Sequence, residues 1–129
     1  VLTTTLQPGS AAELGLLLLQ GKTEVTRLGY DSSRGVLFLD RSQSGQTDFS
    51  ADFSKRIETP VALSGGQLAL QIYVDRTSIE VFAAGGLAVL SASVYPKEQR
   101  HALAAFASGG HGTLKNTRVH TMTRSVRQP

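Results

Sequence analysis

The 129 residues of this chain predict an all-β protein, a two-sheet antiparallel β-sandwich. Short apolar segments recur along the chain, and turn residues interrupt them about every eight to twelve positions. Within several segments, apolar and polar side chains alternate with the period of two that is typical of a half-buried strand. Together these segments give nine or ten expected strands, enough for two packed sheets.

Four strands are expected in the first part of the chain. Residues 2–6 form the first, because the sequence Pro-Gly-Ser breaks the chain soon after it. Residues 13–20 form a buried strand, since their apolar run is too continuous for a strand with one exposed face. A Gly-Lys reversal leads into residues 23–30, and a turn of Asp, Ser, Arg and Gly joins that strand to residues 35–40.

A hairpin is the clearest element of the second part. From residue 41 to residue 59 the chain is polar, and we expect a long connection across one end of the sandwich. Residues 70–74 and 79–82 then alternate in polarity on either side of a polar turn. Helix propensity alone would also allow a helix over residues 102–107, but the glycine pair that follows favours a strand. The remaining expected strands are 88–95, 103–108 and 112–123.

Composition restricts the class of protein. Residues 1–129 are expected to form a single domain, and the absence of cysteine excludes a disulfide framework. The longest apolar run, Leu16 to Leu19, is too short to cross a membrane. A net charge of +3, with scattered basic residues and an Arg-containing tail, gives no nucleic-acid-binding pattern. The histidines, His101, His111 and His120, lack the spacing of a metal site, and no phosphate-binding loop or other cofactor motif is present.

Three blocks of sequence resemble the C-terminal β-sandwich domain of glycoside hydrolase family 32, which contains invertases, levanases and exo-inulinases. The strongest is VDRTSIEVF, Val74 to Phe82, followed at the expected distance by Val94-Tyr95-Pro96. The block LGYDSSRGVLFLDRSQSG, Leu28 to Gly45, and the opening LQPGSAAELG, Leu6 to Gly15, agree with it. Beyond Pro96 only the rhythm of strands matches. The resemblance implies a lectin-like, concanavalin-type jelly roll.

The resemblance also implies that this chain is not the catalytic part of such an enzyme. In that family a separate five-bladed propeller supplies the nucleophile, an Arg-Asp-Pro motif and an acid/base Glu beside a Cys. The chain contains no Trp, no Cys and no Arg-Asp-Pro sequence. Glycoside hydrolysis generally requires two carboxyl groups placed across the scissile bond, and nothing in the sequence indicates such a pair. We therefore expect an accessory domain, either excised from an enzyme or free-standing.

Candidate ligand-binding residues gather at two Asp-Arg pairs and on one strand. Carboxylates accept and guanidinium groups donate hydrogen bonds to neighbouring sugar hydroxyls, and a Tyr ring offers a surface on which a sugar packs. The same charged residues can instead tie turns to strands, and that alternative stays open. We interpret Phe38 and Phe82 as core residues. The candidates are Asp40, Arg41, Tyr73, Asp75, Arg76, Glu80 and Tyr95.

Two functions follow from these observations. The first is a non-catalytic module that recognises β-fructans, levan or inulin, similar to carbohydrate-binding module family 66; without Trp, a site for the terminal fructosyl unit is easier to build than a long stacking groove. The second is a structural domain that stabilises a family 32 propeller or mediates dimerisation. An open apolar patch of Leu17, Leu19, Leu87 and Leu90 would favour the second. The resemblance implies secretion of a bacterial type, although the sequence does not exclude the cytoplasm.

Overall fold

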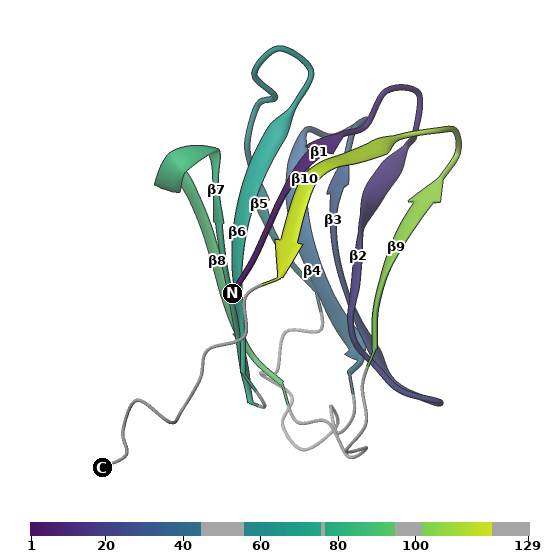
Figure 1. Ribbon diagram of the computed structural model, residues 1–129, viewed down its shortest axis with the longest axis vertical. Helices are drawn as coiled ribbons and strands as arrows, with labels where there is room; N and C mark the ends of the chain where they lie inside the picture. The colour runs from purple at the N-terminus through teal and green to yellow at the C-terminus, as the bar shows by residue number, and fades with distance from the viewer. Residues whose placement is uncertain (45–55, 76, 95–101, 120–129) are drawn as a thin grey trace.

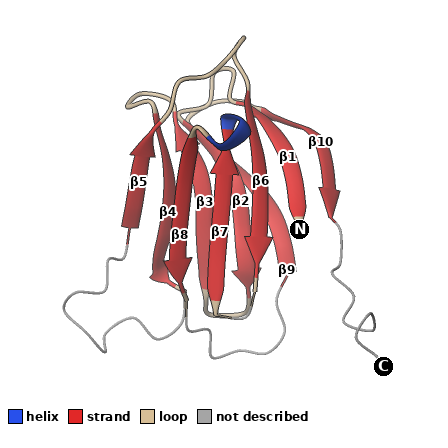
Figure 2. Cartoon of the chain, turned by 90° about the vertical axis from the view of Figure 1, so that its left-hand side faces the viewer, coloured by secondary structure: helices blue, strands red, loops and turns tan. Residues whose placement is uncertain are grey.

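Two five-stranded antiparallel sheets pack face to face in the computed structural model, which describes residues 1–44, 56–75, 77–94 and 102–119 (Figure 1). We call them the front sheet and the back sheet, because Figure 2 shows the first facing the viewer and the second behind it. The front sheet has the order β10 (Thr113–Val119), β1 (Leu2–Gln7), β6 (Leu68–Val74), β7 (Ser78–Ala83) and β8 (Ala88–Ser93). The back sheet has the order β5 (Arg56–Pro60), β4 (Val36–Gln43), β3 (Val25–Asp31), β2 (Glu13–Gln20) and β9 (Ala102–Ser108).

The predicted antiparallel β-sandwich is confirmed. Residues 102–107 form a strand, as the glycine pair after them indicated. The long connection expected over residues 41–59 is partly wrong, because β4 continues to Gln43 and β5 begins at Arg56. Sequence patterning missed β5 because Ile57 is its one large apolar residue, with Arg56 and Glu58 on either side. Residues 45–55, 95 and 120–123, which also belong to predicted elements, lie outside the described residues.

Alternating side chains from both sheets build the core. In β6 the inward residues Leu68, Leu70 and Ile72 are buried, while Ala69 and Gln71 between them are exposed. In β4 the inward residues Leu37 and Leu39 are fully buried. Burying a Leu or Ile side chain stabilises the fold by roughly 1.5–3 kcal/mol relative to exposure. The sandwich is therefore held by residues that the period-two pattern already identified.

One side of the sandwich is closed and the other is open. Strands β5 and β8, the edges of their sheets on one side, pack against each other. On the opposite side, β9 and β10 are the edge strands, joined by a turn that contains Gly109 and Gly110. There Leu103, which shares the inward face of β9 with Ala105, remains 43% exposed, and the inward Val119 of β10 remains 62% exposed.

Two glycines face each other on the outer side of the back sheet. Gly15 of β2 pairs directly with Gly29 of β3. A Cβ atom on Gly15 would lie 1.9 Å from the carbonyl oxygen of Leu28, and a Cβ atom on Gly29 would lie 2.9 Å from the ring of Phe38. Both distances are too short for a side chain, so the sequence requires glycine at this pair.

We expect Gly15→Ala to lower the free energy of unfolding by about 2–3 kcal/mol or more, because the clash involves backbone that cannot move aside. Chemical denaturation of the purified chain measures this change. Ser91→Ala, on an exposed strand position, is the control and should stay within about 0.5 kcal/mol of the unsubstituted protein. Equal stability of the two variants would contradict the packing described here.

Candidate functional site

The predicted site residues that the structure describes are divided between the two sheets. Asp40 and Arg41 lie in β4 of the back sheet, whereas Tyr73 and Glu80 lie in β6 and β7 of the front sheet. Asp75 stands in the exposed turn between β6 and β7. Arg76 and Tyr95 lie outside the described residues. Asp40 and Asp75, the described acidic members of the two Asp-Arg pairs, therefore belong to different sheets.

The first Asp-Arg pair shapes the end of β4. Between the pairings of β3 and β4 the register shifts by one residue, and the extra residue lies in β4 after Asp40. The Oδ1 atom of Asp40 accepts hydrogen bonds from the amide and the hydroxyl of Ser42, at 3.0 and 2.6 Å. Burial disfavours the ionised form of Asp40, but these hydrogen bonds and the charges of Arg56 and Arg27 together outweigh it and lower the pKa of the carboxyl. Asp40 thus holds the local turn in place.

Arg41 links the two sheets from the inside. Its side chain points inward and is 8% exposed. Its Nη1 atom donates a short hydrogen bond to the backbone carbonyl oxygen of Ser93, at the end of β8 in the front sheet. A buried guanidinium group needs such partners, since an unpaired buried charge is strongly unfavourable. These contacts place Arg41 in the packing between the sheets and away from both outer faces.

The outer face of the back sheet carries a pair of aromatic rings covered by arginines. Phe38 and Phe106 come from strands on either side of the Gly15–Gly29 pair, and the missing side chains leave room for their rings. The guanidinium carbon of Arg56 lies 4.0 Å from the centre of the Phe38 ring. The corresponding distance from Arg27 to the Phe106 ring is 4.7 Å. Such cation–π contacts, together with the arginine stems, leave Phe38 fully buried although it faces outward.

Carboxylates neutralise these arginines in turn. Arg27 pairs with Glu13 at 3.0 Å, and Arg56 pairs with Glu58 at 2.9 Å. Glu58 also accepts a bidentate pair of hydrogen bonds from Arg34, both 2.7 Å long. The hydrogen bonds from Arg34 and then Arg56 lower the pKa of Glu58 to about 2. The charges of this face are thus satisfied by one another.

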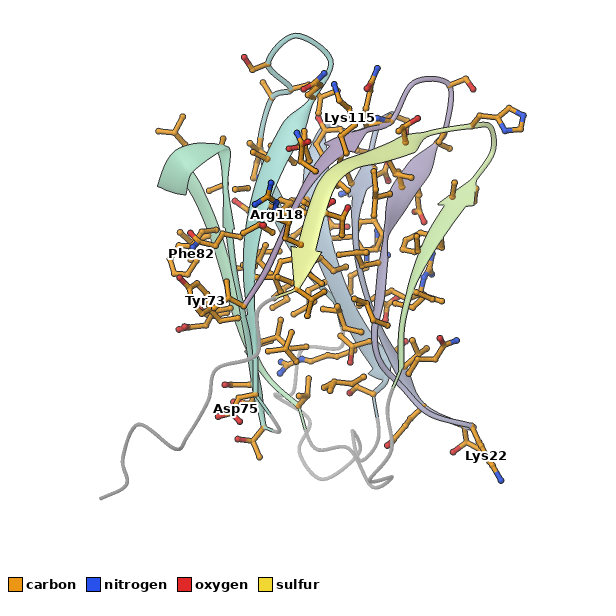
Figure 3. The ribbon with its side chains drawn as sticks, in the orientation of Figure 1. Lys22, Tyr73, Asp75, Phe82, Lys115 and Arg118 are labelled. Atoms are coloured by element: carbon orange, nitrogen blue, oxygen red, sulfur yellow. The ribbon has the colours of Figure 1, made fainter. Side chains whose placement is uncertain are left out.

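The outer face of the front sheet has a different character. The rings of Tyr73 and Phe82 meet edge to face with their centres 5.8 Å apart, and both are half-buried. The Nε2 atom of Gln71 donates a 3.0 Å hydrogen bond to the Tyr73 hydroxyl. Glu80 is exposed and lies between Tyr73 and Ser91 in the register of β6, β7 and β8. Figure 3 shows Tyr73 and Phe82 on this outer side, away from the back sheet.

Several sequence-based interpretations change with the structure. Phe82 is not a core residue, because it shares the outer face with Glu80, as the alternation within its strand indicated. Phe38 is buried as expected, but outside the space between the sheets. The hydrogen bond from Gln71 to Tyr73 was not predicted, since a single polar residue on a strand carries no distinctive pattern.

The four leucines whose open patch would favour a structural role do not come together. Leu87 is 88% exposed beside the front sheet, Leu90 is buried, and Leu17 and Leu19 belong to β2 of the back sheet. No group of three metal-ligating side chains comes together among the described residues. In the same part of the chain, no helix is long and apolar enough to span a membrane.

Comparison with known proteins places this geometry in a family context. The family described as glycosyl hydrolases family 32 C terminal matches residues 1–121. The levanase of Bacillus subtilis is 36% identical over 118 residues, which are 91% of this chain and 17% of the levanase. The extracellular exo-inulinase of Aspergillus ficuum is 35% identical over 102 residues, which are 78% of this chain and 19% of that enzyme. The crystal structure of exo-inulinase from Aspergillus awamori superposes with a TM-score of 0.77 at 31% identity, covering 84% of this chain and 22% of that one. The chain thus spans less than a quarter of the length of these relatives.

Acid should weaken the back-sheet network. The folded-state pKa of Glu58, about 2, lies below its ordinary value of 4.5, so the unfolded chain binds more protons between these values. The ionised Glu58 carboxylate therefore contributes to stability above about pH 4.5, and this contribution is lost as the pH falls toward 2. We expect Glu58→Gln to lower the Tm at neutral pH and to reduce the fall in Tm on acidification.

Thermal unfolding across this pH range tests the expectation. Glu80→Gln changes an exposed carboxylate on the opposite face and should keep the pH profile of the unsubstituted chain. If Glu58→Gln also keeps the full loss of Tm, then the ion pairs of Glu58 with Arg34 and Arg56 do not stabilise the fold.

Proposed function

The chain belongs to the family 32 glycosyl hydrolase C-terminal domains, which are the non-catalytic part of these enzymes, and from this premise we propose that it is a β-fructan-binding accessory domain. The proposed ligand is levan or inulin, and the proposed parent is a longer, secreted β-fructofuranosidase. The names of the relatives, levanase and extracellular exo-inulinase, support both the ligand class and secretion. The catalytic propeller of the parent would be the partner domain.

The contrast between the two outer faces carries this proposal. On the back sheet the rings are covered and the charges are paired with one another. On the front sheet, Tyr73 and Phe82 keep part of their ring surface exposed beside Glu80, and in the described part of the chain Glu80 forms no ion pair. The front face therefore keeps hydrogen-bonding capacity and ring surface that a ligand can use.

The front-face groups match the chemistry of a sugar. A carboxylate such as Glu80 accepts hydrogen bonds from hydroxyl groups, and the amide of Gln71 both donates and accepts. The rings of Tyr73 and Phe82 provide apolar surface for the C–H groups of a furanose. Because each of these contacts replaces a bond to water, we expect weak binding, with a Kd of roughly 10 μM to 1 mM.

Glu80→Ala should weaken the binding of levan or inulin about tenfold or more, because a hydrogen bond to a charged group is lost. The fold should persist, since Glu80 is exposed. Calorimetric titration with levan, inulin and fructose measures the change. Cellulose and starch are control polysaccharides that should not bind. Glu58→Gln, a carboxylate change on the opposite face, is the control and should bind as the unsubstituted chain does.

Two results would count against the fructan site. If the unsubstituted chain binds none of the fructans, the proposed function is wrong. If Glu80→Ala unfolds the protein, then Glu80 acts in the fold and the ligand site has to be sought elsewhere.

A specific observation favours a second function, docking against the catalytic part of the parent enzyme. On the open side of the sandwich, Leu103 and Val119 face inward yet stay substantially exposed. Apolar side chains left accessible at an interior edge are typical of surfaces that another domain covers. A propeller placed along β9 and β10 would bury the exposed parts of Leu103 and Val119.

Leu103→Asp should weaken association between this chain and a separately produced catalytic region of its parent by about tenfold or more, because a charge would enter a buried contact. Leu87→Asp is the matched control, since Leu87 is 88% exposed and lies away from β9 and β10. Analytical ultracentrifugation of the mixtures distinguishes the two variants. Equal association by both would place the docking surface elsewhere.

A further inference from the structure

One row of side chains crosses the whole front sheet on its outer face. Arg118 of β10 lies opposite Thr3, and Thr3 lies opposite Gln71. Gln71 lies opposite Phe82, which in turn lies opposite Val89 of β8. Residues directly opposite each other in antiparallel strands point to the same face of the sheet. The aromatic pair is therefore one part of a surface that continues to the far edge.

A bulge in β10 brings a second basic side chain onto this surface. Lys115 and Arg118 are three positions apart, so in a regular strand they would point to opposite faces. Asn116 has a φ of 54°, and the register shifts by one residue between the pairings of Thr3 and Thr5. Thr117 instead points inward, where its Oγ1 atom lies 2.8 Å from that of Thr4. The bulge thus turns both cations outward. β-Bulges commonly change the direction in which a side chain points in this way.

The two cations have no acidic partner among the described residues. In the part of the chain that the structure describes, neither Lys115 nor Arg118 forms an ion pair with a carboxylate, whereas Arg27, Arg34 and Arg56 on the back sheet all do. Figure 3 labels Lys115 and Arg118 on β10, and in the strand order β1 lies between β10 and Tyr73 of β6. Their donor groups therefore stay available at the β10 edge of the surface, whereas the rings lie on β6 and β7.

The surface is wider than one sugar ring. With strands about 4.8 Å apart, the four steps from β8 to β10 cover roughly 19 Å. Along this width the hydrogen-bonding groups are spread over five strands and do not converge on one point. Such a distribution suits a ligand with repeated hydroxyl groups along its length.

We propose that the front face binds an internal segment of the fructan, with several consecutive fructosyl residues lying across the strands from β8 to β10. This inference rests on the proposed function and extends it from a terminal fructosyl unit to a run of units. Tyr73, Phe82 and Glu80 contact one end of the segment. Arg118 and Lys115 donate hydrogen bonds to hydroxyl groups at the other end.

Oligosaccharides of increasing length test this inference on the full chain. We expect the Kd per oligosaccharide to fall about tenfold or more from fructose to an oligosaccharide that fills the face, and then to level off. Arg118→Ala should weaken binding of the long oligosaccharide about two- to tenfold, the value of one or two hydrogen bonds, and leave the shortest bound ligand unaffected. Lys22→Ala, in the turn between β2 and β3, is the control and should change neither.

The outcomes separate the two proposals. If fructose binds as tightly as the long oligosaccharide and Arg118→Ala has no effect, the site recognises chain ends, and the inference fails while fructan binding stands. If no fructan of any length binds, both fail. Unfolding of Arg118→Ala is measured in parallel. If this variant is destabilised, Lys115→Ala is used in its place, and the same loss of affinity for the long oligosaccharide is expected.

Discussion

Burial of alternating side chains between two sheets is the constraint on which the rest of the molecule depends. Leu39 from the back sheet and Ile72 from the front sheet are both completely buried, and neither sheet could hide its apolar face without the other. Once every second side chain is committed to this interior, the residues between them must point outward. The fold thereby creates two outer faces, and the sequence is free to use them differently.

The two faces solve the same physical problem in opposite ways. Both carry aromatic rings, which are unfavourable when left fully in water. On the back sheet, the absence of glycine side chains leaves room for the ring of Phe38. Arginine side chains cover that ring, and carboxylates balance the charge of the arginines. On the front sheet, Tyr73 and Phe82 shield each other only in part, and cations stand apart at β10. A face whose charged groups are already paired and whose rings are already covered has few free contacts to offer a ligand. For this reason we propose that sugar binds to the front sheet.

Sequence reasoning succeeded where the signal was local and periodic. The alternation around Ile79 predicted the hairpin, and the run over β2 predicted a buried strand. It failed where tertiary pairing decides the outcome. β5 has too few apolar residues to be recognised without its neighbour β4, and the buried position of Arg41 is stabilised by a carbonyl group of the opposite sheet. The burial of Phe38 on an outer face follows from arginines brought from other strands, which no local pattern indicates.

The most direct test of the central claim is to map the ligand-binding face by NMR. Amide resonances of the ¹⁵N-labelled chain would be followed while a long fructo-oligosaccharide is added. The account predicts shifts concentrated on β6, β7 and β8 and reaching β10 across β1, with the back-sheet residues around Phe38 unchanged. Shifts centred on the back sheet would contradict it, as would the absence of any shift at saturating ligand.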